Sequence, residues 1–298
     1  MTDFAIRTAN LWKNFGSTQV LRGITLDIPA GTVVGLLGAN GAGKSTLIKC
    51  LVGLLRPTQG NSELLGDDSL QLSAEVKERL GYVPQDIRLY SWMTVEQIIQ
   101  YTSAYYPKWD QKLVDKLITN WDIPRTHRIG PLSPGQLQKL GLLLAMGPHP
   151  DLLILDEPVA ALDPLARREF LRSLLEFAQE ENKTILFSTH ITSDLERVAS
   201  HVVMLRAGEV DLYEELDALK DRVKRVRIVA EGDFPPSFEI PNAVQIEVTG
   251  KLAIATVVGA DDALVSLLKQ KWTATVSVED LNLEEIFVEL NSQITPRA

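Results

Sequence analysis

The chain has 298 residues, of which 45% are hydrophobic and 23% charged, and its formal net charge is −9. This composition is typical of a globular protein and excludes collagen-like, coiled-coil and disordered classes. A chain this acidic is unsuited to binding nucleic acid over its whole surface. Cys50 is the one cysteine, so an intrachain disulfide is excluded and a reducing compartment is expected. Without a secretory start or an apolar run of about 18 residues, we expect a cytoplasmic protein whose contact with a membrane is peripheral.

The first two thirds of the chain alternate short apolar runs with segments of helical periodicity, which predicts a mainly parallel sheet covered by helices. Residues 4–28 alternate between polar and apolar and predict an antiparallel layer. Continuous apolar runs predict buried strands at 32–37, 151–156 and 184–189. Helical patterns lie at 44–55, 94–106, 111–120, 134–146 and 164–179. Two helix starts have the residues of a capping box: Thr94 with Gln97, and Ser193 with Glu196.

The pattern changes after a predicted hairpin turn at 206–209. Strand-like segments then alternate with two helical ones, 261–270 and 281–291, so we place a boundary near residue 220. The chain divides into a domain at 1–219 and a small α+β domain at 220–298. Basic residues cluster at 220–227, which we interpret as a solvated linker rather than a phosphate or lipid site.

The strongest motif is GANGAGKST, residues 38–46, which stands between an apolar strand and a helical pattern. Its glycines let successive backbone N–H groups face phosphate oxygens, and the helix start adds its positive dipole end. Lys44 then reaches the β- and γ-phosphates of a nucleotide, and Ser45 ligates magnesium. The candidate nucleotide-binding residues are Gly38, Asn40, Gly41, Ala42, Gly43, Lys44, Ser45 and Thr46.

A second motif, LLILDEP at 152–158, ends an apolar strand with two carboxylates. The carboxyl ends of strands are where α/β sheets bind ligands. Asp156 is therefore expected to hold Mg²⁺, through water, and Glu157 to act as general base on the attacking water. His190 ends a third apolar strand, which predicts a contact with the γ-phosphate.

These motifs, with YVPQD, LSPGQ and ALDP between them, stand in an order that resembles the ATP-binding subunits of ABC transporters, over residues 4–215. The resemblance implies the α/β fold of a P-loop ABC cassette, with a helical subdomain at about 86–150 and a C-terminal accessory domain. It implies ATP and Mg²⁺ as cofactors. It also implies roles for Gln85 in the Q-loop and on Mg²⁺, for Asp163 in the D-loop, and for His190 as the switch histidine. Phe15 matches the aromatic that stacks on adenine, and Trp12 is a second candidate.

The signature of that family is LSGGQ, and here Pro134 replaces its first glycine. Proline suits the first turn of a helix, where no N–H is needed. The resemblance implies that Ser133, Gly135 and Gln136 contact the γ-phosphate of a second subunit, so that ATP lies between two chains of a head-to-tail dimer. The second chain is either another copy or a paralogous subunit.

Two functions agree with these motifs: a transporter ATPase that works with separate membrane permease subunits, and a soluble ATPase of the same superfamily acting on DNA or ribosomes. A single phosphate loop and the absence of extended heptads favour the transporter. A GTPase is excluded, because the one Asn-Lys pair, 182–183, lacks the following aspartate. The segments 90–110 and 281–290 resemble those of exporter ATPases, so we expect export rather than import. The permease is expected to dock around 85–92, with the chain on the inner face of the cell membrane and no nucleic acid as partner.

Overall fold

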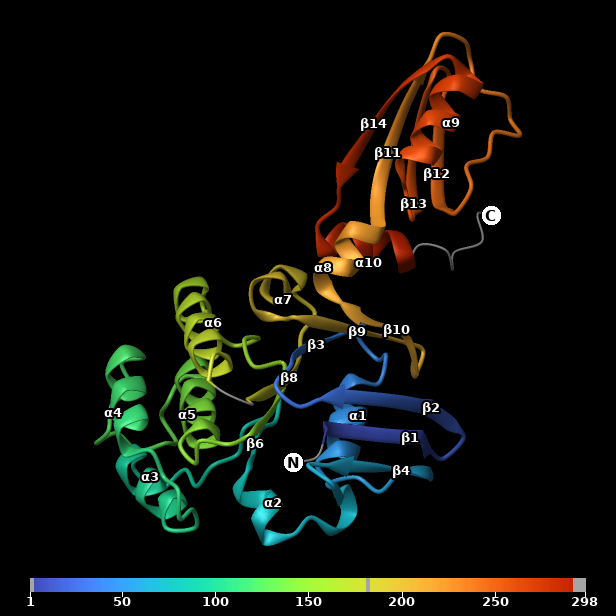
Figure 1. The fold of residues 1–298 in the computed structure, drawn as a ribbon. Coiled ribbons are helices and arrows are strands. Elements are labelled where there is room, and N and C mark those ends of the chain that lie inside the picture. The colour runs from blue at the N-terminus through green and yellow to red at the C-terminus, as the bar shows by residue number, and fades with distance from the viewer. Residues whose placement is uncertain (1–2, 181–182, 292–298) are drawn as a thin grey trace. The chain divides into compact units, whose positions relative to one another are not determined.

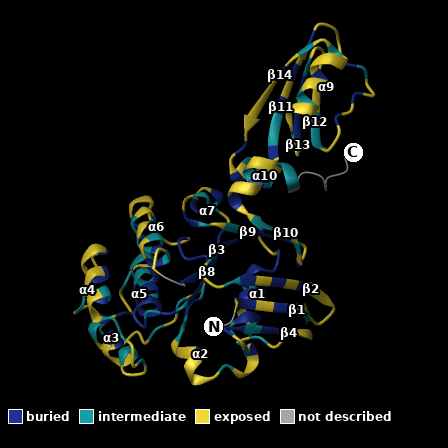
Figure 2. Ribbon diagram, in the orientation of Figure 1, coloured by how far each residue is buried: buried dark blue, intermediate teal, exposed yellow. Residues whose placement is uncertain are grey.

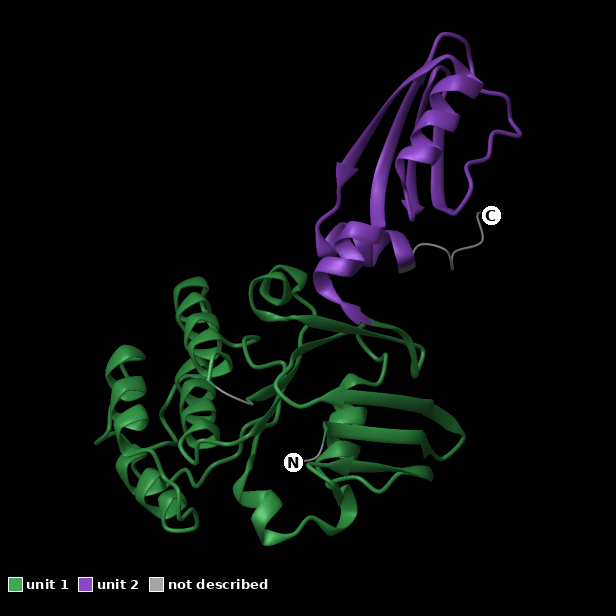
Figure 3. Ribbon diagram, in the orientation of Figure 1, with its two compact units in different colours: residues 1–213 green, residues 214–298 purple. Residues whose placement is uncertain are grey.

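The computed structural model describes residues 3–180 and 183–291, so residues 292–298 of the predicted second domain lie outside the described residues. The chain divides into two compact units, residues 1–213 and 214–298 (Figure 3). Each unit has its own sheets, helices and core, and each is described by itself below. Residue 220, near which the sequence suggested a boundary, lies inside the first helix of the second unit, α8 (Leu216–Arg222).

An antiparallel sheet begins the first unit, in the strand order β2-β1-β4-β5 (Figure 1). The predicted antiparallel layer at 4–28 is present, because β1 (Phe4–Phe15) pairs antiparallel with β2 (Thr18–Pro29). The sheet is completed by β4 (Gln59–Leu64) and β5 (Asp67–Asp68). Apolar side chains from this layer, such as Ile6, Leu26 and Leu64, pack with those of the neighbouring sheet in one core.

The second sheet of this unit has six strands in the order β10-β9-β3-β8-β7-β6. The three apolar runs form adjacent parallel strands whose residues are all buried, visible as dark blue ribbon in Figure 2. Because their carboxyl ends meet at one edge, the residues that follow them come together. The bounds of the strands are β3 (Val33–Leu37), β6 (Leu80–Val83), β7 (Leu152–Asp156), β8 (Thr184–Ser188), β9 (His201–Arg206) and β10 (Glu209–Glu215).

Helices cover the parallel sheet. Their bounds are α1 (Lys44–Leu51), α2 (Ala74–Glu78), α3 (Val95–Ser103), α4 (Gln111–Asn120), α5 (Pro134–Met146), α6 (Pro164–Ala178) and α7 (Thr192–Val198), with a 3-10 turn at Ser69–Gln71. The segment between β6 and β7 contains α3, α4 and α5, and their buried faces include Val95, Val114 and Leu140.

Three expected helix boundaries have clear outcomes. Thr94 and Gln97 form the predicted capping box of α3. The box expected at Ser193 and Glu196 is wrong, because α7 already begins at Thr192 and no side chain caps it. The helix expected to reach residue 55 ends at Leu51, and Gly53 follows with φ +73°. A Cβ at Gly53 would lie 2.0 Å from the carbonyl oxygen of Ser69, so the turn that ends the helix requires a glycine at this position.

The second unit is a four-stranded antiparallel sheet, order β12-β13-β11-β14, with one apolar face. Its core contains Val226, Ile228 and Ala255 from the sheet and Leu268 from α9. The elements are β11 (Val223–Ala230), β12 (Ala243–Thr249), β13 (Leu252–Val258), α9 (Asp262–Trp272), β14 (Ala274–Asp280) and α10 (Leu283–Asn291).

The interpretation of residues 220–227 as a solvated linker is wrong. These residues end α8 and form most of β11, which lies between β13 and β14 in the sheet. Val226 and Ile228 point into the core, while the alternate residues Arg225 and Arg227 point to the opposite face. The basic side chains concealed the first residues of a strand whose apolar residues have the period of two that a half-buried strand requires.

Across 3–180 and 183–291, each helix falls short of the length and hydropathy that a bilayer crossing requires.

Candidate functional site

The glycine-rich loop at 38–46 joins the carboxyl end of β3 to the first turn of α1. Gly43 precedes the helix with φ +108°, and Gly41 has φ +82°, conformations that residues with a Cβ rarely adopt. A Cβ at Gly38 would lie 2.6 Å from the carbonyl oxygen of Leu205. The glycines therefore allow a tight turn that leaves backbone N–H groups at the start of α1, where an anion is favoured.

Lys44 is held at the centre of this loop and is only 7% exposed. Its Nζ donates a hydrogen bond to the carbonyl oxygen of Gly38 at 2.7 Å. The same Nζ lies 3.7 Å from Oε1 of Glu157. A buried ammonium group fixed in this way is a rigid positive charge beside the mouth of the loop.

Asp156, at the end of β7, is buried and joins two hydroxyl groups. Its Oδ1 accepts hydrogen bonds from Ser45 at 3.1 Å and from Ser188 at 2.7 Å. Its Oδ2 is buried and has no hydrogen-bond partner among the residues that the structure describes. Sequence reasoning missed Ser188; the available signal was a hydroxyl at the end of β8, the strand beside β7.

Glu157 follows with a left-handed backbone, φ +51°, which is uncommon for a residue with a long side chain. Its backbone N–H donates to Oγ of Ser188 at 2.9 Å, so one serine holds both Asp156 and Glu157. The Oε2 atom lies 2.8 Å from Nδ1 of His190, whose side chain is 54% exposed. The Glu157 carboxylate is thus buried but oriented by one solvent-facing imidazole and one buried ammonium group.

A cavity of about 340 Å³ opens at this edge of the sheet. Of the residues named from the sequence, it is lined by Asn40, Gly41, Gly43, Lys44, Ser45, Thr46, Gln85 and Glu157, and Val20 is an additional lining residue. The volume is at the lower end of the range for small-molecule sites. Four separate segments of the sequence, around residues 20, 44, 85 and 157, are therefore brought to one cavity.

Phe15 does not line this cavity. Its ring is 51% exposed at the end of β1, and the ammonium group of Lys13 lies 5.0 Å from the ring centroid. Trp12, the second aromatic candidate, donates its indole N–H to Oδ1 of Asn10 at 2.8 Å. Phe15 is the one of the two whose ring is largely exposed, as a stacking surface must be.

The signature residues stand at the start of α5, outside this cavity. Ser133 and Gln136 form a capping box, and Pro134 occupies the first turn of the helix as expected from its missing N–H. The Ser133 hydroxyl accepts from the backbone N–H of Gln136, which leaves its own proton available to a ligand. A Cβ at Gly135 would approach the carbonyl oxygen of Ala161 to 3.1 Å, so the signature lies against the loop after Glu157.

Asp163 ends that loop and caps α6. Its Oδ1 accepts from the backbone N–H groups of Leu165 at 2.9 Å and Ala166 at 3.0 Å. The hydrogen bond from Ala166, the largest cause, lowers the pKa of the Asp163 carboxyl below its ordinary value. Its main visible role is therefore to fix the turn that connects Glu157 to α6.

A glycine-rich loop between a buried parallel strand and a helix, with its lysine, its serine and a strand-end aspartate, defines a P-loop nucleotide-binding protein. The family model for the ABC transporter matches residues 21–160. BcrA of Bacillus licheniformis, a bacitracin transport ATP-binding protein, is 32% identical, over 74% of this chain and 72% of that protein. The chain belongs to the ABC transporter ATP-binding proteins and is an ATPase of that family.

Two further relatives bear on the function. YtrB of Bacillus subtilis (strain 168), an ABC transporter ATP-binding protein, is 26% identical over 95% of this chain and 97% of that protein. CysA of Escherichia coli (strain K12), a sulfate/thiosulfate import ATP-binding protein, is 35% identical over 72% of this chain and 60% of that protein.

Solved structures confirm the fold. An ATP-binding subunit of an ABC transporter is similar with a TM-score of 0.66 and 28% identity, over 73% of this chain and 92% of that one. A dimeric bacterial ABC transporter cassette is similar with a TM-score of 0.64 and 22% identity, over 71% of this chain and 98% of that one. The predicted P-loop ABC cassette is therefore correct.

Proposed function

We propose that this ATPase powers the export of a solute through separate membrane permease subunits, hydrolysing Mg²⁺-ATP held between two chains of a dimer. The observation that carries the proposal is the convergence of Lys44, Ser45, Gln85 and Glu157 on one cavity, beside the buried Asp156. Members of this family work with membrane permease subunits.

The donor set at this edge suits Mg²⁺. The Ser45 hydroxyl and the Asp156 carboxylate are 3.1 Å apart, and Oδ2 of Asp156 is a buried oxygen without a partner in the described part of the chain. Gln85, which lines the same cavity, adds an amide oxygen. No group of three or more His, Cys, Asp or Glu side chains that could hold a metal ion exists within residues 3–180 and 183–291. Such a site favours an ion that also takes phosphate oxygens and water, as Mg²⁺ does, and the bound ion would neutralise phosphate charge.

The chain's own groups divide the chemistry between them. Backbone N–H groups of the loop and the Lys44 ammonium bind the β- and γ-phosphates. The Glu157 carboxylate accepts a proton from the attacking water, and His190 holds that carboxylate through Nδ1 and also contacts the γ-phosphate. The left-handed backbone at Glu157 and its hydrogen bond to Ser188 aim the carboxylate into the cavity.

The dimer is supported by the exposed start of α5. Ser133, Gly135 and Gln136 lie outside the chain's own cavity, so their hydroxyl, N–H and amide groups are available to the nucleotide of a second subunit. A head-to-tail arrangement gives two equivalent composite sites related by a two-fold axis. The second chain is another copy or a paralogous subunit. The similar cassette that was solved as a dimer supports this arrangement by its fold.

The permease is proposed to dock beside Gln85. A groove of about 290 Å³ follows β6 and α5 and is lined by Ile87, Leu89 and Tyr106. Nearby, Tyr90 is 50% exposed and Trp92 is 64% exposed, and their ring centroids lie 5.9 Å apart. Exposed apolar side chains of this density are typical of an interface. A short amphipathic helix of an integral membrane protein would suit such a groove, and the proposal includes a position of the chain at the cytoplasmic face of the cell membrane.

Export is favoured over import by the aromatic segment at 90–110 and by the LNLEEIF stretch that begins α10, both typical of exporter ATPases. Similarity to an import protein exists as well, over 60% of that protein, and the name of YtrB, which is matched over 97% of its length, states no direction of transport. The cargo is selected by the permease.

Affinity purification of the tagged chain from solubilised membranes tests the proposal. We expect an integral membrane protein to be recovered in stoichiometric amount, and a charge placed in the groove, Leu89→Asp, to abolish its recovery while Leu54→Asp, at an exposed site outside the groove, does not. The direction of transport is measured with inside-out vesicles. ATP-dependent uptake of the cargo into these vesicles corresponds to export from the cell. Recovery of ribosomes or DNA-repair proteins, without a membrane protein, would favour the soluble alternative.

A further inference from the structure

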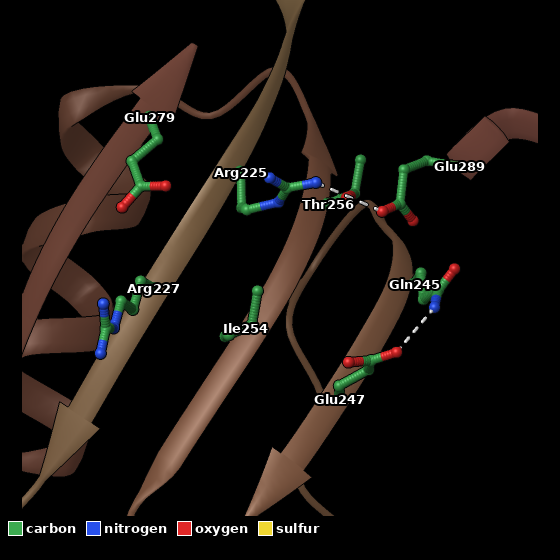
Figure 4. A pocket seen from close by; sticks show the side chains of 8 residues that line it. All are labelled: Arg225, Arg227, Gln245, Glu247, Ile254, Thr256, Glu279 and Glu289. Carbon is green, nitrogen blue, oxygen red and sulfur yellow. Dashed lines mark hydrogen bonds and ion pairs between the residues drawn. The ribbon is translucent and has the colours of Figure 1, made fainter. Parts of the chain in front are cut away.

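The sheet face of the second unit opposite its core carries a hollow of about 330 Å³ (Figure 4). Side chains from all four strands and from α10 surround it, and Ile254 and Thr256 of β13 form its floor. The solvated face of an antiparallel sheet ordinarily carries polar residues. Here charged groups of both signs border one concavity, on strands that hold them rigidly.

One of the two arginines at the hollow is already neutralised. Nη1 of Arg225 lies 2.9 Å from Oε1 of Glu285, and Nη2 lies 3.6 Å from Oε1 of Glu289. In Figure 4 its side chain extends toward Glu289. Arg225 therefore connects α10 to the sheet at the border of the hollow.

The other charged groups remain open. Within the residues that the structure describes, the guanidinium of Arg227 and the carboxylate of Glu279 have no hydrogen-bond or ion-pair partner. The two residues are diagonal neighbours on β11 and β14, because Arg227 is opposite Ser277 and Arg225 is opposite Glu279. Diagonal neighbours are separated by roughly 7–8 Å. A molecule that carries a carboxylate and an ammonium group on one carbon can bridge such a pair.

A third charge lies across the floor of the hollow. Glu247 of β12 is opposite Ile254, which is opposite Arg227, so Glu247 and Arg227 are two strand spacings, about 10 Å, apart. Among residues 3–180 and 183–291, the one hydrogen bond to the Glu247 carboxylate comes from the amide of Gln245, at 3.2 Å. A flexible apolar chain over Ile254 with a cation at its end would satisfy this carboxylate.

From these charges we infer that the hollow binds a free basic α-amino acid, of the length of lysine. Its carboxylate pairs with Arg227, its α-ammonium group with Glu279, its methylene chain lies over Ile254, and its side-chain ammonium group pairs with Glu247. The open charges of the hollow sum to −1, and a basic amino acid carries the complementary charge of +1. Its size suits a site of this volume.

Calorimetric titration of the full chain tests this inference with four probes. L-Lysine is expected to bind, L-norleucine, which lacks the side-chain ammonium group, roughly 10-fold more weakly, and cadaverine and Nα-acetyl-lysine, which lack one α-group each, roughly 10- to 100-fold more weakly. The titrations extend to about 10 mM, so that millimolar dissociation constants are detected. No heat with lysine, or equal binding of cadaverine, would refute the inference.

Two substitutions at exposed positions assign the contacts. Arg227→Gln should weaken lysine binding roughly 10- to 100-fold, whereas Glu247→Gln should remove the preference for lysine over norleucine and leave norleucine binding unchanged. Lys269→Gln, on the exposed side of α9, removes the same charge as the first variant and should bind lysine like the parent. Unchanged thermal midpoints verify folding. Wild-type affinity in a folded Arg227→Gln variant would show that the hollow is not the site.

Discussion

Ser188→Ala isolates the contribution of a single hydroxyl group that connects the Asp156 carboxylate to the backbone N–H of Glu157. The hydroxyl donates to Asp156 at 2.7 Å and accepts from the Glu157 N–H at 2.9 Å, and the serine is fully buried. Alanine leaves a buried N–H without its acceptor and removes one of two donors to Asp156. Each buried group deprived of a partner costs about 1–3 kcal/mol, so we expect the first unit to lose about 2–4 kcal/mol of its free energy of unfolding.

Urea unfolding followed by tryptophan fluorescence measures this loss. With Trp272→Phe in every background, the remaining tryptophans all lie in the first unit. Ser173→Ala is the matched control, because its hydroxyl only donates to the Glu169 carbonyl within α6, and a change within about 0.5 kcal/mol is expected. ATP hydrolysis should also fall in Ser188→Ala, since Glu157 loses its backbone anchor. A loss of stability no larger than that of the control would refute this account of Ser188.

Three further predictions concern the proposed chemistry and one buried thiol. Glu157→Gln should bind ATP and hydrolyse it about 10²–10⁴-fold more slowly, and it should elute as a dimer with ATP until Ser133→Arg is added; normal turnover would contradict the general base. Lys44→Ala should lose measurable Mg²⁺-ATP binding by calorimetry, and an unchanged affinity would mean that the loop does not hold the phosphates. Burial raises the pKa of the Cys50 thiol to about 11, so at pH 8 iodoacetamide should label it only after unfolding; the same linkage lowers stability as the pH rises from about 9 toward 11.

Sequence patterns within short segments were sufficient to predict much of the fold of the nucleotide-binding unit. The continuous apolar runs that became β3, β7 and β8 need burial on both faces, which only a parallel sheet under helices provides. The positive φ angles of Gly41 and Gly43 follow from the residue type that the loop requires. These features depend on residues that are close together in the sequence, so they can be recognised from one sequence alone.

Contacts between distant segments were harder to predict. Ser188 holds residues that are about 30 positions away, and its importance depends on β8 lying beside β7. Ser193 was assigned to a capping box by spacing alone, but the chain had already entered α7 at Thr192. In β11, three basic residues suggested a solvated linker, and the period of Val226 and Ile228 is what identifies the strand.

The place of β11 inside its sheet also determines where the chain can be shortened. A chain cut at residue 227, after the basic cluster, would keep the first part of β11, residues 223–227, without β13 and β14 beside it. Such a segment exposes Val223 and Val226 together with unpaired backbone groups, which is the usual starting point for aggregation between chains. A cut before Leu216 removes the second unit's elements as a set and leaves no partial strand of its sheet. Attempts to study the ATPase unit alone should therefore end ahead of α8.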